Sequence, residues 1–206
     1  MILIPKDLSM SGWRQYAAAE RPSVAVIAGR KVPIREISGV ITCLPRVTEL
    51  ELLHIAAEDR GYVAAEMTAF LLAWLTALPC PVMNRPSPAS LTGPFWRREQ
   101  WATVAARAGL PVSPISRQVS LAHAGAPGNP PTVRVTVVGS RVAGDAHRRV
   151  LDGARRLARL AGVDILTVGF SDGGPAGAFV SAEPTPDLSR DQTADRILEH
   201  LTGGVT

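Results

Sequence analysis

The sequence predicts a mixed α/β fold made of a parallel-sheet N-terminal domain and a small α+β C-terminal lobe. In the N-terminal half, short β-branched runs alternate with segments of helical apolar spacing, which is typical of a parallel sheet with crossover helices. In the C-terminal half, two apolar runs flank a Ser-Asp-Gly-Gly turn, which is typical of an antiparallel hairpin. We therefore expect an α/β domain over residues 1–116, a linker over 117–132 and the C-terminal lobe over 133–206.

The N-terminal domain is predicted from a series of apolar segments and one exposed turn. An apolar run at 2–4 predicts a buried first strand, 23–28 and 31–35 predict a hairpin, and 39–44 predicts the central strand. Leu50, Leu53 and Ile55 follow Thr48 at helical spacing and predict a helix that Thr48 caps, and 62–78 predicts a second helix that Pro79 ends. Further segments predict a strand at 81–83, an exposed turn at 84–88 and a helix at 100–108.

The C-terminal lobe is predicted from five segments. Alternating apolar residues at 133–139 predict a strand, and 145–161 predicts an amphipathic helix with arginines on its polar side. The runs 163–170 and 176–182 predict the hairpin. Ser189 and Gln192 form a capping-box pattern that predicts the start of a last helix.

Composition excludes several classes of protein. The chain has 206 residues, 46% of them hydrophobic, and a formal net charge of +4, which is too low for a dedicated nucleic-acid binder. Two cysteines are too few for a disulfide framework, so we expect thiols in a cytoplasmic protein. The longest apolar stretch, 64–78, is 15 residues long and is too short to cross a bilayer, which takes about 20. We therefore expect neither nucleic acid nor a membrane as a partner.

Three segments resemble the ATP-grasp superfamily, in particular its peptide-tailoring and ribosomal-protein-modifying ligases. GVITCL at 39–44, the stretch 59–94 and WATVAARAGLPVSP at 101–114 resemble the domain that leads such enzymes. VDILTVGFSDGGPAGAFVSAEPTPDL, from 163 onward, resembles the terminal hairpin of the family. The resemblance implies an Asp on one strand and Phe-x-Glu-x-Asn-Pro on the next, which hold magnesium ions against nucleotide phosphates.

The sequence departs from this family pattern at the nucleotide site. The first ligand position is Asp164, but Ser181 stands at the Glu position and Glu183 at the Asn position, so one ligand of three is kept. The family's nucleotide-clasping lobe would lie between Pro114 and Val133, where this chain has only 18 residues and no lysine. We therefore expect a truncated descendant that needs no cofactor, with magnesium and ATP bound only if a partner completes the site.

Three groups of residues are candidate sites. Asp164 and Glu183 either hold a residual metal ion or are exposed carboxylates left from ancestry. Candidate ligand-binding residues lie where the resemblance places the turn toward the nucleotide site, and they are Asn84, Arg85, Arg97 and Arg98. The arginines of the amphipathic helix form either a solvated face or a docking surface for an acidic partner or phosphate, and they are Arg148, Arg149, Arg155, Arg156 and Arg159. No catalytic residue is assigned.

Three functions remain open at this stage. The first is a non-catalytic accessory that binds a partner or peptide in a peptide or natural-product modification pathway. The second is an ATP-dependent ligase, forming amide or ester bonds, whose site another subunit completes. The third is a small-molecule binding protein. Because loss of a lobe exposes apolar surface, we also expect a homodimer or hetero-oligomer.

Overall fold

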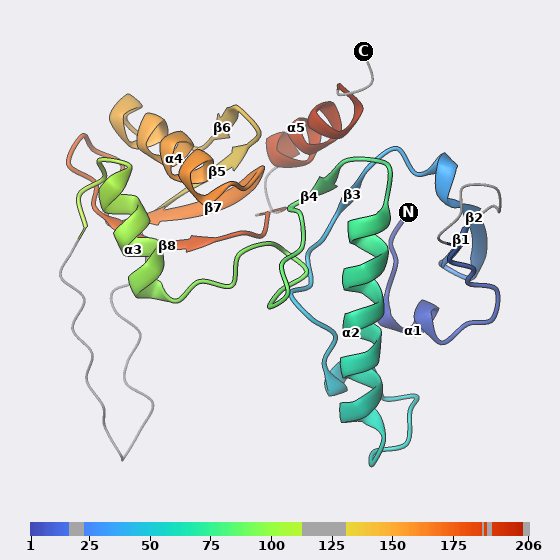
Figure 1. Cartoon of the computed structure of the whole chain (residues 1–206). Helices are drawn as coiled ribbons and strands as arrows, with labels where there is room; N and C mark the ends of the chain where they lie inside the picture. The colour runs from blue at the N-terminus through green and yellow to red at the C-terminus, as the bar shows by residue number, and fades with distance from the viewer. Residues whose placement is uncertain (17–22, 113–130, 187, 189–190, 204–206) are drawn as a thin grey trace. The chain divides into compact units, whose positions relative to one another are not determined.

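A computed structural model describes residues 1–16, 23–112, 131–186, 188 and 191–203. The chain packs as two compact units, Met1–Gly93 with Leu201–Thr206, and Pro94–His200. Both contain helices and strands, in agreement with the predicted mixed α/β class (Figure 1). In the part of the chain covered by these ranges, no helix is long and apolar enough to span a membrane.

The first unit combines two small sheets with one long helix. Its elements are α1 (Pro5–Leu8), β1 (Val24–Ile27), β2 (Arg30–Pro33), η1 (Ile34–Glu36), β3 (Val40–Ile41), η2 (Glu49–Glu51), α2 (Arg60–Ala77) and β4 (Val82–Met83). The predicted hairpin is confirmed, because β1 and β2 pair antiparallel. The parallel sheet is confirmed only in part: β3 and β4 pair in parallel across the α2 crossover, but through two residues each.

The predicted first strand does not form. Residues 2–4 lie outside any strand, and Ile4 is 48% exposed. The backbone N–H of Ile4 donates instead to the carboxylate of Asp7, at 3.1 Å. The same buried carboxylate accepts the N–H groups of Ala28 and Gly29 at 3.2 and 3.3 Å, so it ties α1 to the turn between β1 and β2. The N-terminal segment is therefore held by a buried acceptor and not by a strand ladder.

The helix predicted after Thr48 shrinks to the single turn η2. Leu50 and Leu53 are 82% and 71% exposed, so the apolar spacing that predicted the helix does not mark a buried face. The Arg60 guanidinium donates to the carbonyls of Leu53 and Ile55, at 3.3 and 2.9 Å. In a continued helix these carbonyls would accept backbone N–H groups. Here they accept the Arg60 guanidinium instead, just before α2 begins.

The long helix α2 confirms the predicted second helix and supplies the core of the first unit. Leu71, Trp74 and Leu75 are buried on its inner side. Trp13 packs edge-on against Phe70 and Trp74, with ring centroids 5.3 and 5.7 Å apart. Aromatic pairs in this T-shaped geometry add to the free energy of apolar burial, so Trp13 is fixed to α2.

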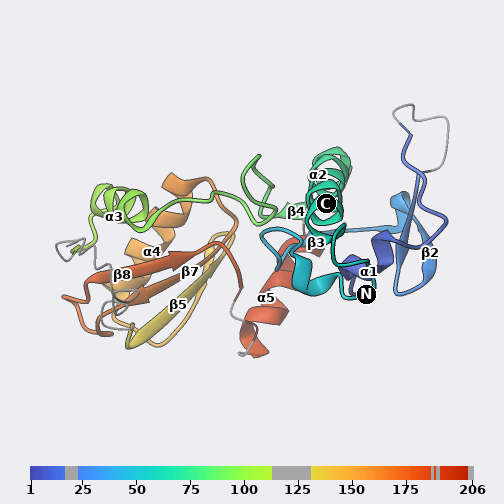
Figure 2. The ribbon, with the colours of Figure 1, turned by 90° about the horizontal axis from the view of Figure 1, so that it is seen from below.

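The second unit is an antiparallel sheet with helices on one face. Its elements are α3 (Arg98–Arg107), β5 (Val133–Val138), β6 (Arg141–Ala143), α4 (Arg148–Ala161), β7 (Ile165–Phe170), β8 (Phe179–Glu183) and α5 (Asp191–Thr202). The strand order is β6-β5-β7-β8, and every neighbouring pair is antiparallel. Figures 1 and 2 show α3 and α4 on the same side of this sheet, where their apolar residues share one core with β5, β7 and β8. The predicted hairpin of β7 and β8 is confirmed.

The packing of α3 differs from the expected division into domains. We placed this helix in a domain ending at residue 116, but Trp101 and Ala105 are buried in the core that α3 shares with α4 and β8. Leu110 lies against Gly153 of α4, which has no side chain to keep it away. The expected boundary at 116 and most of the 117–132 linker lie outside the described residues.

Candidate functional site

Helix α4 presents the arginine-rich face that the sequence singled out. Its N-terminus is capped by His147, whose Nδ1 accepts the backbone N–H of Arg149 at 3.2 Å. Val150, Ala154 and Leu157 are buried toward the sheet. Because apolar residues at this helical spacing occupy one side, the arginines fall on the remaining surface.

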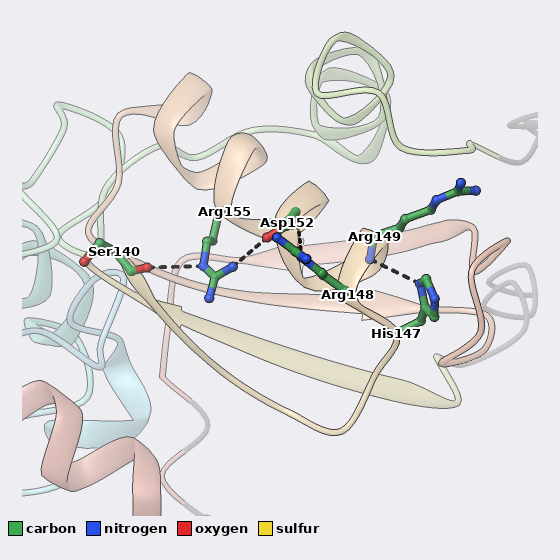
Figure 3. Close-up of polar contacts among 6 residues, drawn as sticks. All are labelled: Ser140, His147, Arg148, Arg149, Asp152 and Arg155. Atoms are coloured by element: carbon green, nitrogen blue, oxygen red, sulfur yellow. Dashed lines mark hydrogen bonds and ion pairs between the residues drawn. The ribbon is translucent and has the colours of Figure 1, made fainter.

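One carboxylate holds two of these arginines. Asp152 lies 3.6 Å from Nε of Arg148 and 2.6 Å from Nη1 of Arg155 (Figure 3). Nε of Arg155 also donates to the backbone carbonyl of Ser140, at 3.2 Å. Part of the positive charge on this face is therefore compensated within the unit.

The other three arginines differ in what they contact. Nε of Arg156 donates to the carbonyl of Ala108 at 2.8 Å, so this side chain joins α4 to the end of α3. Among the described residues, the side chains of Arg149 and Arg159 make no hydrogen bond or ion pair, and both are exposed. The predicted face thus divides into three engaged arginines and two that are open to a partner.

The hairpin does not bring Asp164 and Glu183 together. The register of β7 and β8 places Glu183 opposite Thr167 and Ser181 opposite Gly169. Asp164 precedes β7 and lies three residues from Thr167, about 10 Å along an extended strand and on the opposite face. Across the described ranges, no group of three His, Cys, Asp or Glu side chains could hold a metal ion.

Asn84 lies in a closed polar loop and not in the exposed turn that the sequence predicted. It is 2% exposed, and its Nδ2 donates to the carbonyl of Thr92 at 3.2 Å. Thr42 Oγ1 donates to the carbonyl of Leu91 at 2.9 Å, and Ser90 Oγ lies 3.0 Å from Thr92 Oγ1. The loop after β4 is therefore held by its own hydroxyl and amide groups, and the prediction of an exposed Asn84 is wrong.

The three arginines proposed with Asn84 are all exposed. Arg85 follows it in the first unit, whereas Arg97 and Arg98 begin α3 in the second. The backbone N–H of Arg97 donates to Oε1 of Gln100 at 2.9 Å, and this bond fixes the start of α3. The grouping of these arginines with Asn84 stays a prediction.

The surroundings of both cysteine thiols shift the pKa in the direction that disfavours the thiolate. Burial raises the pKa of the Cys43 thiol. Burial also raises the pKa of Cys80, and a hydrogen bond to its backbone partly opposes that rise. Because the thiolate is the reactive form, both residues have a smaller reactive fraction at neutral pH than a free cysteine.

Sequence reasoning missed a polar pair inside the second sheet. Thr136 and Thr167 are buried on neighbouring strands, and their hydroxyl oxygens lie 3.2 Å apart. Thr167 Oγ1 also donates to the carbonyl of Thr185, at 2.9 Å. Threonine is a common strand residue, so the sequence carries no signal that would separate this pair from ordinary strand positions.

Comparison with known proteins adds a shared fold. No protein-family model and no curated protein sequence matches the chain. Among solved structures, the chain is similar to the macrocyclase MdnC bound with precursor peptide MdnA from Microcystis aeruginosa MRC, with a TM-score of 0.68, 12% identity, and coverage of 91% of this chain and 85% of that chain. The macrocyclase MdnB from Microcystis aeruginosa MRC matches with a TM-score of 0.49, 12% identity, and coverage of 91% and 81%. At this level of identity, the match to MdnC establishes a fold held in common.

Proposed function

We propose that this chain is a non-catalytic, ATP-grasp-like protein that binds a peptide or protein partner in a peptide-modification pathway. The observation that carries the proposal is the fold shared with MdnC, a macrocyclase whose structure contains a precursor peptide, over 91% of this chain. The likeness supports the peptide-tailoring relationship that the sequence predicted. It supports one class of partner, a precursor peptide or an enzyme that modifies such a peptide.

The absence of catalysis is inferred from the ligand positions themselves. Magnesium needs several oxygen ligands that converge in near-octahedral geometry. Here Ser181 replaces a carboxylate, and the register of β7 and β8 separates Asp164 from Glu183. The only lysines of the chain, Lys6 and Lys31, both lie in the first unit. Charge-assisted contacts to a triphosphate are correspondingly few.

The open arginines of α4 supply the chemistry for docking an acidic segment of the partner. Arg149 and Arg159 are exposed and unpaired in the described structure, and guanidinium groups bind carboxylates through two parallel hydrogen bonds. A cluster of like charges also accelerates association with an oppositely charged partner, an effect that salt screens. We therefore expect binding that weakens as ionic strength rises.

A titration of a fluorescently labelled precursor peptide against the full chain tests the proposal. We expect the anisotropy to rise to saturation with an affinity that falls at high salt. The double variant R149A/R159A should bind the peptide more weakly. The matched control is R30A/R35A, which removes two exposed arginines from the first unit. Absence of saturable binding to both the precursor peptide and a peptide-modifying macrocyclase of the MdnC type would contradict the proposal.

Exposed apolar side chains of the first unit support a protein partner as well. Leu50, Leu53 and Tyr62 are 82%, 71% and 71% exposed. Monomeric proteins rarely leave large apolar patches in water. We propose a homodimer or hetero-oligomer. Sedimentation of the chain, alone and with the modifying enzyme, checks this proposal, and a monomer in both samples would contradict it.

The alternative function is a ligase that a second subunit completes. It is favoured by the sheet face on which Glu183 lies opposite Thr167, because this face carries polar side chains where a packed core would carry apolar ones. If another subunit supplies the missing ligands, replacing Asp164 and Glu183 by alanine should abolish product formation in the reconstituted mixture. Unchanged turnover would remove their role.

A further inference from the structure

Helix α5 carries two buried polar groups that have no partner. Thr193 is 0% exposed, and neither its Oγ1 nor Nη1 of Arg196 has a hydrogen-bond partner within the described structure. Residues three apart in an α-helix lie on the same side, so both groups belong to one face. Buried polar atoms in folded proteins are nearly always hydrogen-bonded, and the exceptions point to a missing ligand, ion or water.

The two α5 carboxylates with described side chains, Glu199 and Asp195, do not pair with Arg196. Glu199 is engaged in an ion pair with Arg141 of β6. Asp195 is exposed and adjacent to Arg196 in sequence, so it lies about 100° away around the helix. Arg196 as a whole residue is partly exposed, although its Nη1 is buried.

A third donor extends this face by one turn. His200 lies four residues after Arg196, so it projects from the same side of α5. Its ring stands over Gly139, where a Cβ would come within 2.5 Å of Nδ1. Gly139 has a φ of +56°, in the left-handed region that favours glycine. Glycine at this position therefore fits the backbone and also leaves room for the His200 ring.

We propose that this face of α5 is a binding site for an oxyanion, a carboxylate or a phosphate. The juxtaposition that carries the proposal is a hydroxyl, a guanidinium and an imidazole at positions 193, 196 and 200, two of them buried without an acceptor. An oxyanion accepts hydrogen bonds at several oxygens and compensates the guanidinium charge, which both unpaired groups require. The site lies on α5 and is independent of the docking proposed for α4.

Thermal unfolding of the full chain with added anions tests this site. Two probes, inorganic phosphate and N-acetylglutamate, are titrated at constant ionic strength set by chloride. Because a ligand that binds only the folded state raises Tm, we expect Tm to rise with phosphate, with N-acetylglutamate or with both. The probe that acts identifies the source of the oxyanion as phosphate or carboxylate.

Three variants locate the effect. Removing the charge in Arg196→Gln should raise the anion concentration needed for a given shift about tenfold or more, because a hydrogen bond to a charged group contributes that much. Thr193→Val should leave the anion-free Tm unchanged or higher, since it removes an unsatisfied hydroxyl, while it weakens the anion response. The control Arg159→Gln removes an exposed arginine of α4 and should respond as the unmodified chain does.

Three results would overturn the proposal. One is the absence of any Tm shift with either probe. The second is an anion response that Arg196→Gln retains or that Arg159→Gln loses equally. The third is a lower anion-free Tm in Thr193→Val, because that would show that the hydroxyl already has a partner in the folded chain. If Arg196→Gln does not fold, the anion titration of Thr193→Val alone tests the proposed site.

Discussion

Replacing Asp152 by asparagine should change stability and partner binding in opposite directions. Asp152 pairs with Arg148 at 3.6 Å and with Arg155 at 2.6 Å. The Arg148 side chain is 91% exposed and those of Asp152 and Arg155 are 38% and 40% exposed, so solvent screens both pairs. Exposed ion pairs of this kind each contribute about 0.2–1 kcal/mol. We therefore expect Asp152→Asn to lose about 0.5–1 kcal/mol of unfolding free energy.

The same change frees Arg148, leaves Arg155 with only its hydrogen bond to the Ser140 carbonyl, and raises the net charge of this face by one. An acidic partner then gains a Coulomb attraction of similar size, which corresponds to roughly two- to fivefold tighter binding at low salt. At about 1 M salt the Debye length falls to about 3 Å, and the gain should vanish. A small loss of stability together with a salt-sensitive gain of affinity would show that Asp152 competes with an acidic partner for the same arginines.

Urea unfolding and anisotropy with a labelled oligoglutamate peptide measure the two effects. Asp145→Asn is the matched control, because Asp145 is exposed just before α4 and forms no ion pair with its arginines. It changes the net charge of the protein equally. Weaker binding in Asp152→Asn, or a gain no larger than that of Asp145→Asn, would refute the reasoning.

Two substitutions test the fold, and one alkylation measurement tests the thiols. Gly153→Ala should lower the free energy of unfolding by about 1–2 kcal/mol, measured in urea, because the new Cβ collides with Leu110. This cost exceeds the gain in helix propensity that alanine brings. A variant as stable as the unmodified chain would contradict this packing of Leu110 on Gly153. Asp7→Ala should lose about 3 kcal/mol, since three backbone N–H groups lose a buried charged acceptor, and a loss below about 1 kcal/mol would show that water replaces it. Burial raises the pKa of Cys43 and Cys80, so alkylation should be slow at neutral pH with a midpoint above that of a free thiol. The raised pKa contributes stability that is present below the pKa of the unfolded thiol and is lost as pH rises toward the folded value; a midpoint at or below that of free cysteine would contradict both statements.

Local patterns predicted the long elements well. The apolar spacing of residues 62–78 and 145–161 corresponds to α2 and α4, because a helix must bury its apolar side wherever it packs. The turn between β7 and β8 was predictable because Ser-Asp-Gly-Gly between two apolar runs favours a hairpin. Residues 48–56 failed because Arg60 takes carbonyls that a helix would use, a contact that spacing does not reveal.

The sequence predicted which residues could form candidate sites, but not which contacts those residues make in the fold. The arginines of α4 were visible in the sequence, but the division into engaged and open ones depends on Asp152 and on the carbonyl of Ala108, which packing brings to Arg156. The pairing of Asp164 with Glu183 assumed a hairpin register that the longer β7–β8 turn does not give. Thr193 and Arg196 carried no signal, because polar residues on a terminal helix are typical of solvent-exposed positions.

Calorimetry of the purified full chain with Mg-ATP tests the central claim most directly. The proposed function requires that this chain, which shares its fold with MdnC, lacks the groups that hold a triphosphate. We predict no saturable heat of binding for the chain alone. Saturable binding with a micromolar Kd would contradict the claim, because it would show a nucleotide site in this polypeptide.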